Sequence, residues 1–129
     1  MTMLEKIIQA KHRRIGIQKL SNSFTEHYIG SNTNIDTPSF FSSLNNCSNE
    51  YKIIAEMKKA SPSAGIIVDD YNPEELAAEY ENKGYTNLSV LTEEDHFLGS
   101  ISHVSKVRKV CDLPILQKDF IVDEWQIYQ

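Results

Sequence analysis

From residue 52 onward, the sequence alternates short apolar runs with amphipathic segments in a regular order. The amphipathic segments begin near Asn72 and Ser100 and separate the apolar runs from one another. Apolar strands joined by helices pair in parallel through right-handed crossovers. We therefore expect an α/β fold in which helices cover a parallel sheet. The three apolar runs are residues 53–57, 88–91 and 114–118.

Both predicted helices have clear boundary signals. Asn72 is a typical N-cap, Pro73 follows it at the first helical position, and Gly84 is a typical stop. Ser100 is expected to cap the second helix, whose apolar residues recur at helical spacing as far as residue 111. The segment 61–65, which contains Ser, Pro and Gly, is predicted to be a turn after the first strand.

The residues before this pattern predict a helix. Thr2 and Glu5 have the spacing of a capping box, and Leu4, Ile7 and Ile15 recur on one helical face. A run of basic residues on the opposite face is expected to be solvated. These basic residues are Lys6, Lys11, His12, Arg13, Arg14 and Lys19.

The segment 21–49 is rich in Ser, Asn and Thr and is predicted to be a connector. Within it, Thr37 is expected to cap a short helix with Pro38 at its first position. Near the other end of the sequence, Asp123 is expected to cap a last short helix, in which Trp125 is a packing residue. We divide the chain into a helical extension and connector, residues 1–50, and strand–helix units, residues 51–129.

Composition excludes several classes of protein. The 129 residues have a net charge of −5, which disfavours nucleic acid and anionic membranes as partners, and no apolar run approaches the length of a membrane span. Cys47 and Cys111 lack the spacing of a disulfide framework or zinc site, and residues 1–20 lack a signal-peptide pattern. We expect a cytoplasmic location. The histidines that form no metal-ligand spacing are His12, His27 and His103.

Charged residues stand at the ends of two predicted strands. Glu56 and Lys58 are two residues apart, so they share one face of the first strand near its carboxyl end, and Lys118 ends the third strand. Buried charges are costly unless they are paired or used, and barrels place their active sites at this end of the strands. Spacing alone does not distinguish a structural ion pair from an anion-binding site or a general acid.

Four motifs stand in order along the chain: residues 54–63 (IAEMKKASPS), 88–93 (LSVLTE), 97–100 (FLGS) and 116–121 (LQKDFI). These motifs resemble indole-3-glycerol-phosphate synthase, a family of tryptophan biosynthesis, and the resemblance covers nearly the whole chain. It implies a (β/α)8 TIM barrel preceded by an extra N-terminal helical segment. Eight units of such a barrel need about 250 residues. We therefore expect a truncated barrel with about three strand–helix units.

The resemblance also implies a reaction, without a metal or an organic cofactor. The family is a carbon–carbon lyase that closes the ring of 1-(2-carboxyphenylamino)-1-deoxyribulose 5-phosphate, with loss of carbon dioxide and water, to give indole-3-glycerol phosphate. By resemblance, Lys118 is the general acid, Lys58 lies near the substrate carboxylate, and Glu56 orients both lysines. The residues implied for substrate binding are Ser61, Pro62, Leu91, Phe97 and Phe120.

The family places its general base and its phosphate site on later strands, so we expect the isolated chain to be inactive. The alternative is a non-catalytic remnant, or a half-barrel of a split enzyme that needs a C-terminal half. Leu91 and Leu116 would lack an opposite barrel wall, which predicts association with that half or self-association. The 59–63 and 118–121 runs disfavour another barrel, such as phosphoribosylanthranilate isomerase. His96 is interpreted as an exposed loop residue, with substrate contact as the alternative.

Overall fold

The computed structural model describes residues 1–21, 37–48 and 51–129. Most of the predicted connector, together with His27, lies outside the described residues. The chain forms two compact units: a helical unit, which contains α1 and Phe120–Gln129, and a sheet unit, Thr37–Asp119. In chain order the elements are α1 (Met3–Ser21), α3 (Phe40–Asn46), β1 (Ile54–Met57), β2 (Ala60–Ser61), β3 (Gly65–Ile66), α4 (Pro73–Asn82), β4 (Asn87–Leu91), α5 (Ile101–Arg108), β5 (Ile115–Lys118) and α6 (Trp125–Tyr128).

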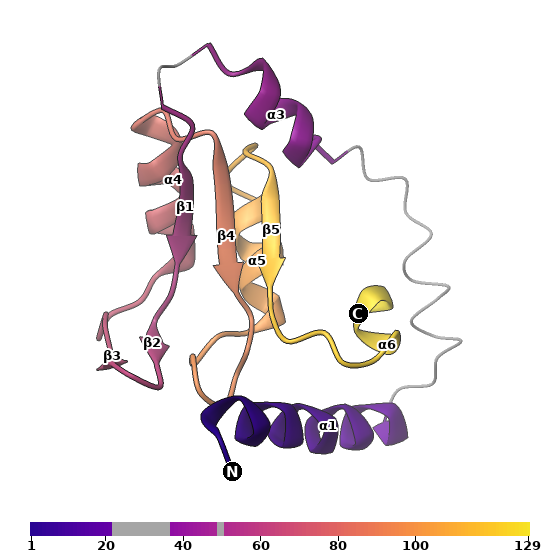
Figure 1. The fold of residues 1–129 in the computed structure, drawn as a ribbon. Coiled ribbons are helices and arrows are strands. Elements are labelled where there is room, and N and C mark those ends of the chain that lie inside the picture. The colour runs from indigo at the N-terminus through magenta and orange to yellow at the C-terminus, as the bar shows by residue number, and fades with distance from the viewer. Residues whose placement is uncertain (22–36, 49–50) are drawn as a thin grey trace. The chain divides into compact units, whose positions relative to one another are not determined.

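The sheet unit is built on three parallel strands in the order β1-β4-β5. In Figure 1 the three arrows point the same way, so their carboxyl ends meet at one edge of the sheet, and α4 and α5 lie behind one face. The order follows from two crossovers, each through one helix. The predicted fold class is confirmed: an N-terminal helix precedes parallel strand–helix units, the first part of a (β/α)8 barrel.

The core lies between the sheet and its two helices. All five residues of the central strand β4 are buried, as is usual for a parallel strand with neighbours on both sides. The side chains that alternate toward the helices come from β1 and β4 and meet apolar residues of α4, of α5 and of the segment after α5. These buried core residues are Ala55, Met57, Leu88, Val90, Ala77, Val107 and Cys111.

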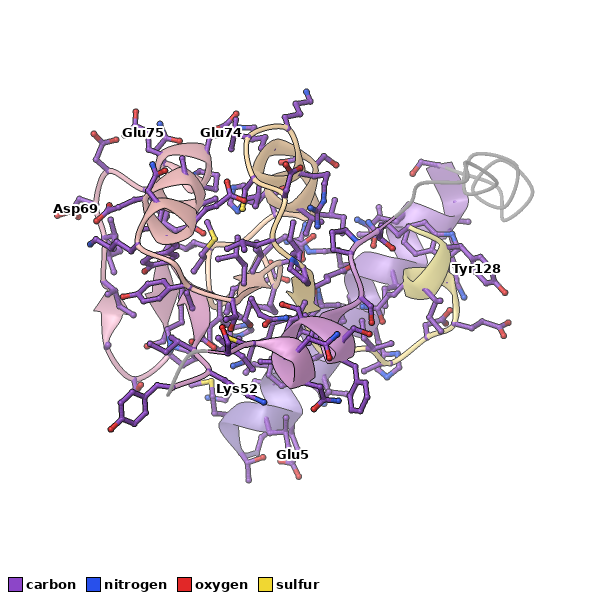
Figure 2. All side chains as sticks on the ribbon, turned by 90° about the horizontal axis from the view of Figure 1, so that it is seen from above. Glu5, Lys52, Asp69, Glu74, Glu75 and Tyr128 are labelled. Carbon is purple, nitrogen blue, oxygen red and sulfur yellow. The ribbon has the colours of Figure 1, made fainter. Side chains whose placement is uncertain are left out.

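The predicted boundaries of α4 and the predicted start of α5 are confirmed by their hydrogen bonds, whereas α5 ends at Arg108, earlier than predicted. Asn72 Oδ1 accepts from the backbone N–H groups of Glu74 and Glu75 at 3.1 and 3.3 Å, and Figure 2 labels both glutamates beside α4. Gly84, two residues beyond the end of α4, has a φ of 79°, a conformation that a residue with a Cβ rarely adopts. At α5, Ser100 Oγ accepts from the N–H two residues on.

The helical unit confirms the predicted capping box. Thr2 N donates to the Glu5 carboxylate, and Glu5 N donates to Thr2 Oγ1. In the same unit, Lys19 Nζ lies 2.7 Å from Asp123 Oδ2. The predicted cap of the last helix was wrong by one residue, because the N-cap of α6 is Glu124, although Asp123 Oδ1 accepts from Trp125 N. Trp125 is buried, as expected of a packing residue.

The predicted division of α1 into a buried and a solvated face was wrong at two positions. Lys11 is buried (3% exposed), whereas Leu4 is exposed (56%). The spacing explains Lys11, because it stands four residues after Ile7 and four before Ile15, on the stripe that both share. The aliphatic part of a lysine side chain can pack against apolar surface, as the side chains of Ile7 and Ile15 do.

The predicted cap of the short helix was also wrong. The N-cap of α3 is Ser39, whose Oγ accepts from the N–H three residues on, and not Thr37, so Pro38 precedes the helix. A serine caps a helix at least as well as a threonine. With this start, the carbonyl of Phe40 accepts a hydrogen bond from the buried Asn87 side chain at the amino end of β4.

Candidate active site

The three residues predicted to be catalytic meet at the carboxyl ends of the strands. Glu56 lies within β1, Lys58 follows that strand, and Lys118 is the last residue of β5. Glu56 Oε1 accepts from Lys58 Nζ at 2.7 Å, and Glu56 Oε2 accepts from Lys118 Nζ at 2.5 Å. One carboxylate therefore holds both ammonium groups, each with its own oxygen.

The central strand lies between Glu56 and Lys118. Neighbouring strands are about 4.8 Å apart, so β1 and β5 are separated by about twice that distance, which only long side chains span. The register pairs Glu56 with Ser89 and Leu91 with Lys118, so the ion pair crosses β4 between these two positions. Ser89 is buried, and its Oγ has no hydrogen-bond partner among the described residues.

The two lysines set the electrostatics of the cluster. Hydrogen bonds from Lys118 and then from Lys58 lower the pKa of Glu56, against a smaller opposing effect of burial. Two ammonium groups and one carboxylate leave one net positive charge. The side chains of Glu56 and Lys58 are about one third exposed and that of Lys118 is half exposed, so solvent reaches the cluster. Such a site attracts an anion and has N–H donors for it.

A small hairpin follows Lys58, where only a turn was predicted. β2 and β3 pair antiparallel, and Ser61 faces Gly65 in their register. Ser61 Oγ accepts from Ala64 N at 3.2 Å, so this hydroxyl already holds the turn, whereas Pro62 is exposed. The substrate contacts predicted for Ser61 and Pro62 stay predictions.

The loop after β4 lies against the start of this hairpin. The carbonyl of Phe97 accepts from Ala60 N at 3.2 Å, which places the half-buried Phe97 near the end of β1. Phe120, the other aromatic residue predicted at the site, belongs to the helical unit. The substrate-binding roles of Phe97 and Phe120 both stay predictions.

The two leucines that we expected to lack an opposite barrel wall differ in their exposure to solvent. Leu116 on β5 is 46% exposed, as predicted, but Leu91 is only 3% exposed. Leu91 ends the central strand, with a neighbouring strand on each side, and the backbone of Gly99 packs against its carbonyl. The expectation that Leu91 would be left uncovered was therefore wrong. Its contact with a substrate stays a prediction.

Sequence reasoning missed two groups that organise the loops of the site. Thr92 Oγ1 donates to Asp119 Oδ2 at 2.7 Å, directly beside Lys118. Glu93 is fully buried, and its carboxylate accepts backbone N–H groups of the loop that it begins. His96 is half-buried, with Nδ1 3.3 Å from Glu93 Oε1, so its interpretation as an exposed residue was wrong. A glutamate after a strand resembles an ordinary surface residue, and no local signal marks it as buried.

Within residues 1–21, 37–48 and 51–129, no three His, Cys, Asp or Glu side chains are arranged to hold a metal ion. None of the helices in these ranges has the length and apolar character needed to cross a membrane. Cys47 and Cys111 are both free thiols.

Helix-covered parallel strands with an ionisable cluster at their carboxyl ends are the arrangement of the active-site end of (β/α)8-barrel proteins, the class to which we assign this chain. Residues 4–129 match the family model described as indole-3-glycerol phosphate synthase. The chain belongs to the indole-3-glycerol phosphate synthase family.

Individual relatives agree with this family. An indole-3-glycerol phosphate synthase of Chloroherpeton thalassium is 40% identical over 132 residues, which cover 100% of this chain and 50% of the relative. One of Neisseria meningitidis serogroup C is 40% identical over 129 residues, 98% of this chain and 50% of the relative. One of Acetivibrio thermocellus is 49% identical over 90 residues, 70% of this chain and 34% of the relative. The chain spans about half the length of the first two of these curated relatives.

Proposed function

We propose that this chain supplies the lysine side of the active site for the synthesis of indole-3-glycerol phosphate. The observation that supports this most directly is the bonding of both Lys58 and Lys118 to the single carboxylate of Glu56. Ion pairs that solvent reaches contribute only about 0–1 kcal/mol to stability. Such a small gain in stability does not explain why two lysines meet at one carboxylate. A reaction that needs two ammonium groups at fixed positions does explain it.

The proposed substrate is 1-(2-carboxyphenylamino)-1-deoxyribulose 5-phosphate. The ring carbon that bears the carboxylate forms a bond to the keto carbon, and Lys118 donates a proton to the keto oxygen, which becomes a hydroxyl. Carbon dioxide leaves the same ring carbon and its bonding electrons restore the aromatic ring. The hydroxyl then leaves as water with a proton from an acid, and a proton lost from the neighbouring carbon completes the indole double bond. No metal or organic cofactor takes part in this scheme.

Lys58 and Glu56 have supporting roles in this proposal. Lys58 pairs with the substrate carboxylate until that group leaves, which fixes the ring relative to the keto carbon. Glu56 orients both ammonium groups before the substrate binds. Phe97, Leu91, Phe120 and Pro62 line the site of the aromatic ring, and Ser61 contacts the substrate from the hairpin. We place this chemistry in the cytoplasm.

The remaining barrel strands complete the site in our proposal. They supply the general base and the phosphate site, whether they belong to the same polypeptide or to a separate one. The barrel-facing side of the sheet supports this, because Ile54 and Leu116, which flank β4 on that side, are each 46% exposed. Apolar side chains beside unpaired strand edges are suited to contact further strands.

The test is reconstitution from two chains. The 129-residue chain is mixed with the C-terminal half of the Chloroherpeton thalassium relative, and formation of indole-3-glycerol phosphate is followed by fluorescence. We expect activity only in the mixture, and a loss of about 10²- to 10⁴-fold on Lys118→Ala, the range for removal of a general acid. Lys83→Ala is the matched control, because Lys83 forms an exposed ion pair with Glu79 on α4.

Each other outcome rejects a defined part of the proposal. Activity that survives Lys118→Ala would reject the role of this lysine. No activity in any mixture would favour the alternative of a non-catalytic remnant, provided that the two halves of the relative itself reconstitute an active enzyme under the same conditions. Activity of the isolated chain would reject the need for a second half.

A further inference from the structure

The loop between β4 and α5 is folded around one buried carboxylate. Glu93 Oε2 accepts from the backbone N–H groups of His96 at 2.8 Å and Phe97 at 3.0 Å. Glu93 Oε1 accepts from Asp95 N at 3.2 Å and lies 3.3 Å from His96 Nδ1. Glu93 itself is fully buried. Three consecutive amide groups therefore point at one side chain.

The loop is also fixed at its other end. Gly99 N donates to the carbonyl of Glu93 at 2.8 Å, and a Cβ on Gly99 would lie 2.8 Å from the carbonyl carbon of Thr92. Leu98 has a φ of 53°, in the left-handed region that a leucine rarely adopts. A leucine keeps this backbone conformation only where the surrounding structure holds it, and here the hydrogen bonds of the loop do so.

The loop is joined to the end of β1 through one backbone hydrogen bond. Ala60 N donates to the carbonyl of Phe97 at 3.2 Å, and Ala60 stands two residues after Lys58. Glu93 thus fixes the N–H of Phe97 while Ala60 fixes its carbonyl. The backbone of this one aromatic residue is held from both sides, next to the strand that carries Glu56.

We propose that Glu93 is a positioning residue, which holds Phe97 where its ring contacts the aromatic ring of the substrate. The proposal rests on the function proposed above, because that function places an anthranilate ring at this end of the sheet. A carboxylate is needed for the task, since both of its oxygens accept hydrogen bonds. A glutamine has one acceptor oxygen, so its NH2 group would face either Asp95 N or the N–H groups of His96 and Phe97 and leave them unpaired.

The test measures binding of anthranilate to the 129-residue chain, followed by NMR through the backbone amide signals of Lys58, Ala60 and residue 97, which every variant retains. The variants are Glu93→Gln, Phe97→Ala and the double variant, and their amide spectra report whether each remains folded. We expect Glu93→Gln to weaken binding by about fivefold, the size expected for one aromatic contact, and Phe97→Ala to do the same. We expect the double variant to bind as weakly as either single variant, because both changes remove the same contact.

The double variant separates positioning from a general structural role. If Glu93→Gln only loosened the fold, it would weaken binding by the same factor whether or not Phe97 is present, which would overturn the proposal. Glu93→Gln binding as tightly as the parent would overturn it too. Glu93→Asp, which keeps the charge but shortens the reach, replaces Glu93→Gln if that variant does not fold, with the same expectation.

Failure of this proposal is distinguishable from failure of the proposed function. Absence of saturable anthranilate binding by the parent chain would overturn the role given to Phe97 and Glu93, while turnover in the two-chain mixture would still support the function. Conversely, coupled binding effects would support the positioning role even if the two-chain mixture gave no turnover, and that absence would reject the function where the two halves of the relative itself are active together.

Discussion

Lys118 Nζ lies 2.5 Å from Glu56 Oε2, although the central strand β4 separates the strands that carry these two residues. The ion pair crosses β4 beside Ser89, a residue with one of the smallest side chains. Since Glu56 also accepts from Lys58, a single carboxylate sets the direction of both lysines. The three charged groups therefore hold one another in place, although solvent still reaches them.

Glu56→Gln is expected to lower the turnover of the two-chain mixture while changing the stability of the chain very little. A glutamine has one acceptor oxygen and no charge, so it does not hold two ammonium groups. We expect the turnover of the two-chain mixture to fall by about 10²-fold, as for loss of a preorganised electrostatic contact. We expect the free energy of unfolding to change by less than about 1 kcal/mol, because solvent screens the pair. Turnover assays and urea unfolding measure the two effects.

Glu79→Gln is the matched control for that variant. Glu79 forms an ion pair with Lys83 within α4, and both side chains are more than half exposed. This change should leave turnover unaltered. Equal losses of turnover in the two variants would mean that the Glu56 cluster has no special role.

The alternation of strands and helices made most of the sheet unit predictable. Asn72 and Ser100 cap their helices as expected, because an N-cap depends on residues that are neighbours in sequence. The meeting of Glu56 with Lys58 was likewise predictable from the two-residue period of a strand. Its meeting with Lys118 required the strand order, which the rule for parallel crossovers supplies.

Other features depend on neighbours that are distant in sequence or on equivalent local choices. Ser39 and Thr37 are both good caps, and the sequence does not show that the carbonyl of Phe40 meets Asn87 when the helix starts after Ser39. The burial of Glu93 could not be predicted, since a glutamate is almost never buried without partners. Its partners are backbone N–H groups, which every residue except proline has and which therefore leave no trace in the sequence.

Gly99→Ala is expected to destabilise the sheet unit by about 1–3 kcal/mol, the cost of forcing an extra carbon into a packed site. The new Cβ would lie 2.8 Å from the carbonyl carbon of Thr92 and 2.9 Å from the carbonyl oxygen of Glu93, and backbone atoms do not move aside easily. Gly16→Ala is the matched control in α1, where a Cβ meets nothing within 4 Å. It should raise stability by about 0.5–1 kcal/mol. Urea unfolding compares the two, and a loss no larger than that of an ordinary surface substitution at Gly99 would contradict the packing described for this loop.

His103 is expected to make stability depend on pH. Burial lowers its pKa below the ordinary 6.5, Lys106 and Lys59 lower it further, and Glu74 opposes them. Its ring packs against Tyr71, whose pKa burial raises to about 12, so Tyr71 stays protonated throughout this range. As the pH falls through 6.5, the unfolded chain binds a proton at this residue before the folded chain does. The free energy of unfolding therefore decreases until the pH reaches the folded pKa.

The measurement is urea unfolding at a series of pH values between 7.5 and 5.5. His103→Gln removes the titrating group, so the difference in stability between parent and variant should shift in favour of the variant as the pH falls. A difference that stays constant over this range would contradict the lowered pKa. A shift in favour of the parent would mean that folding raises the pKa of His103 instead of lowering it.

Leu116→Gln is expected to reduce self-association of the isolated chain. Leu116 is on the barrel-facing side of β5, 46% exposed, beside a strand edge that no described strand covers. Two such faces bury apolar surface when they meet, so the sedimentation coefficient of the parent should rise with concentration. The variant should show a smaller rise, and so should the parent after addition of the C-terminal half, which competes for the same face. Ile127→Gln is the control, because Ile127 is 74% exposed but lies in α6 rather than on the sheet. A parent chain that sediments as a monomer at all concentrations and unfolds in one cooperative transition would show that this face is stable in water without a partner.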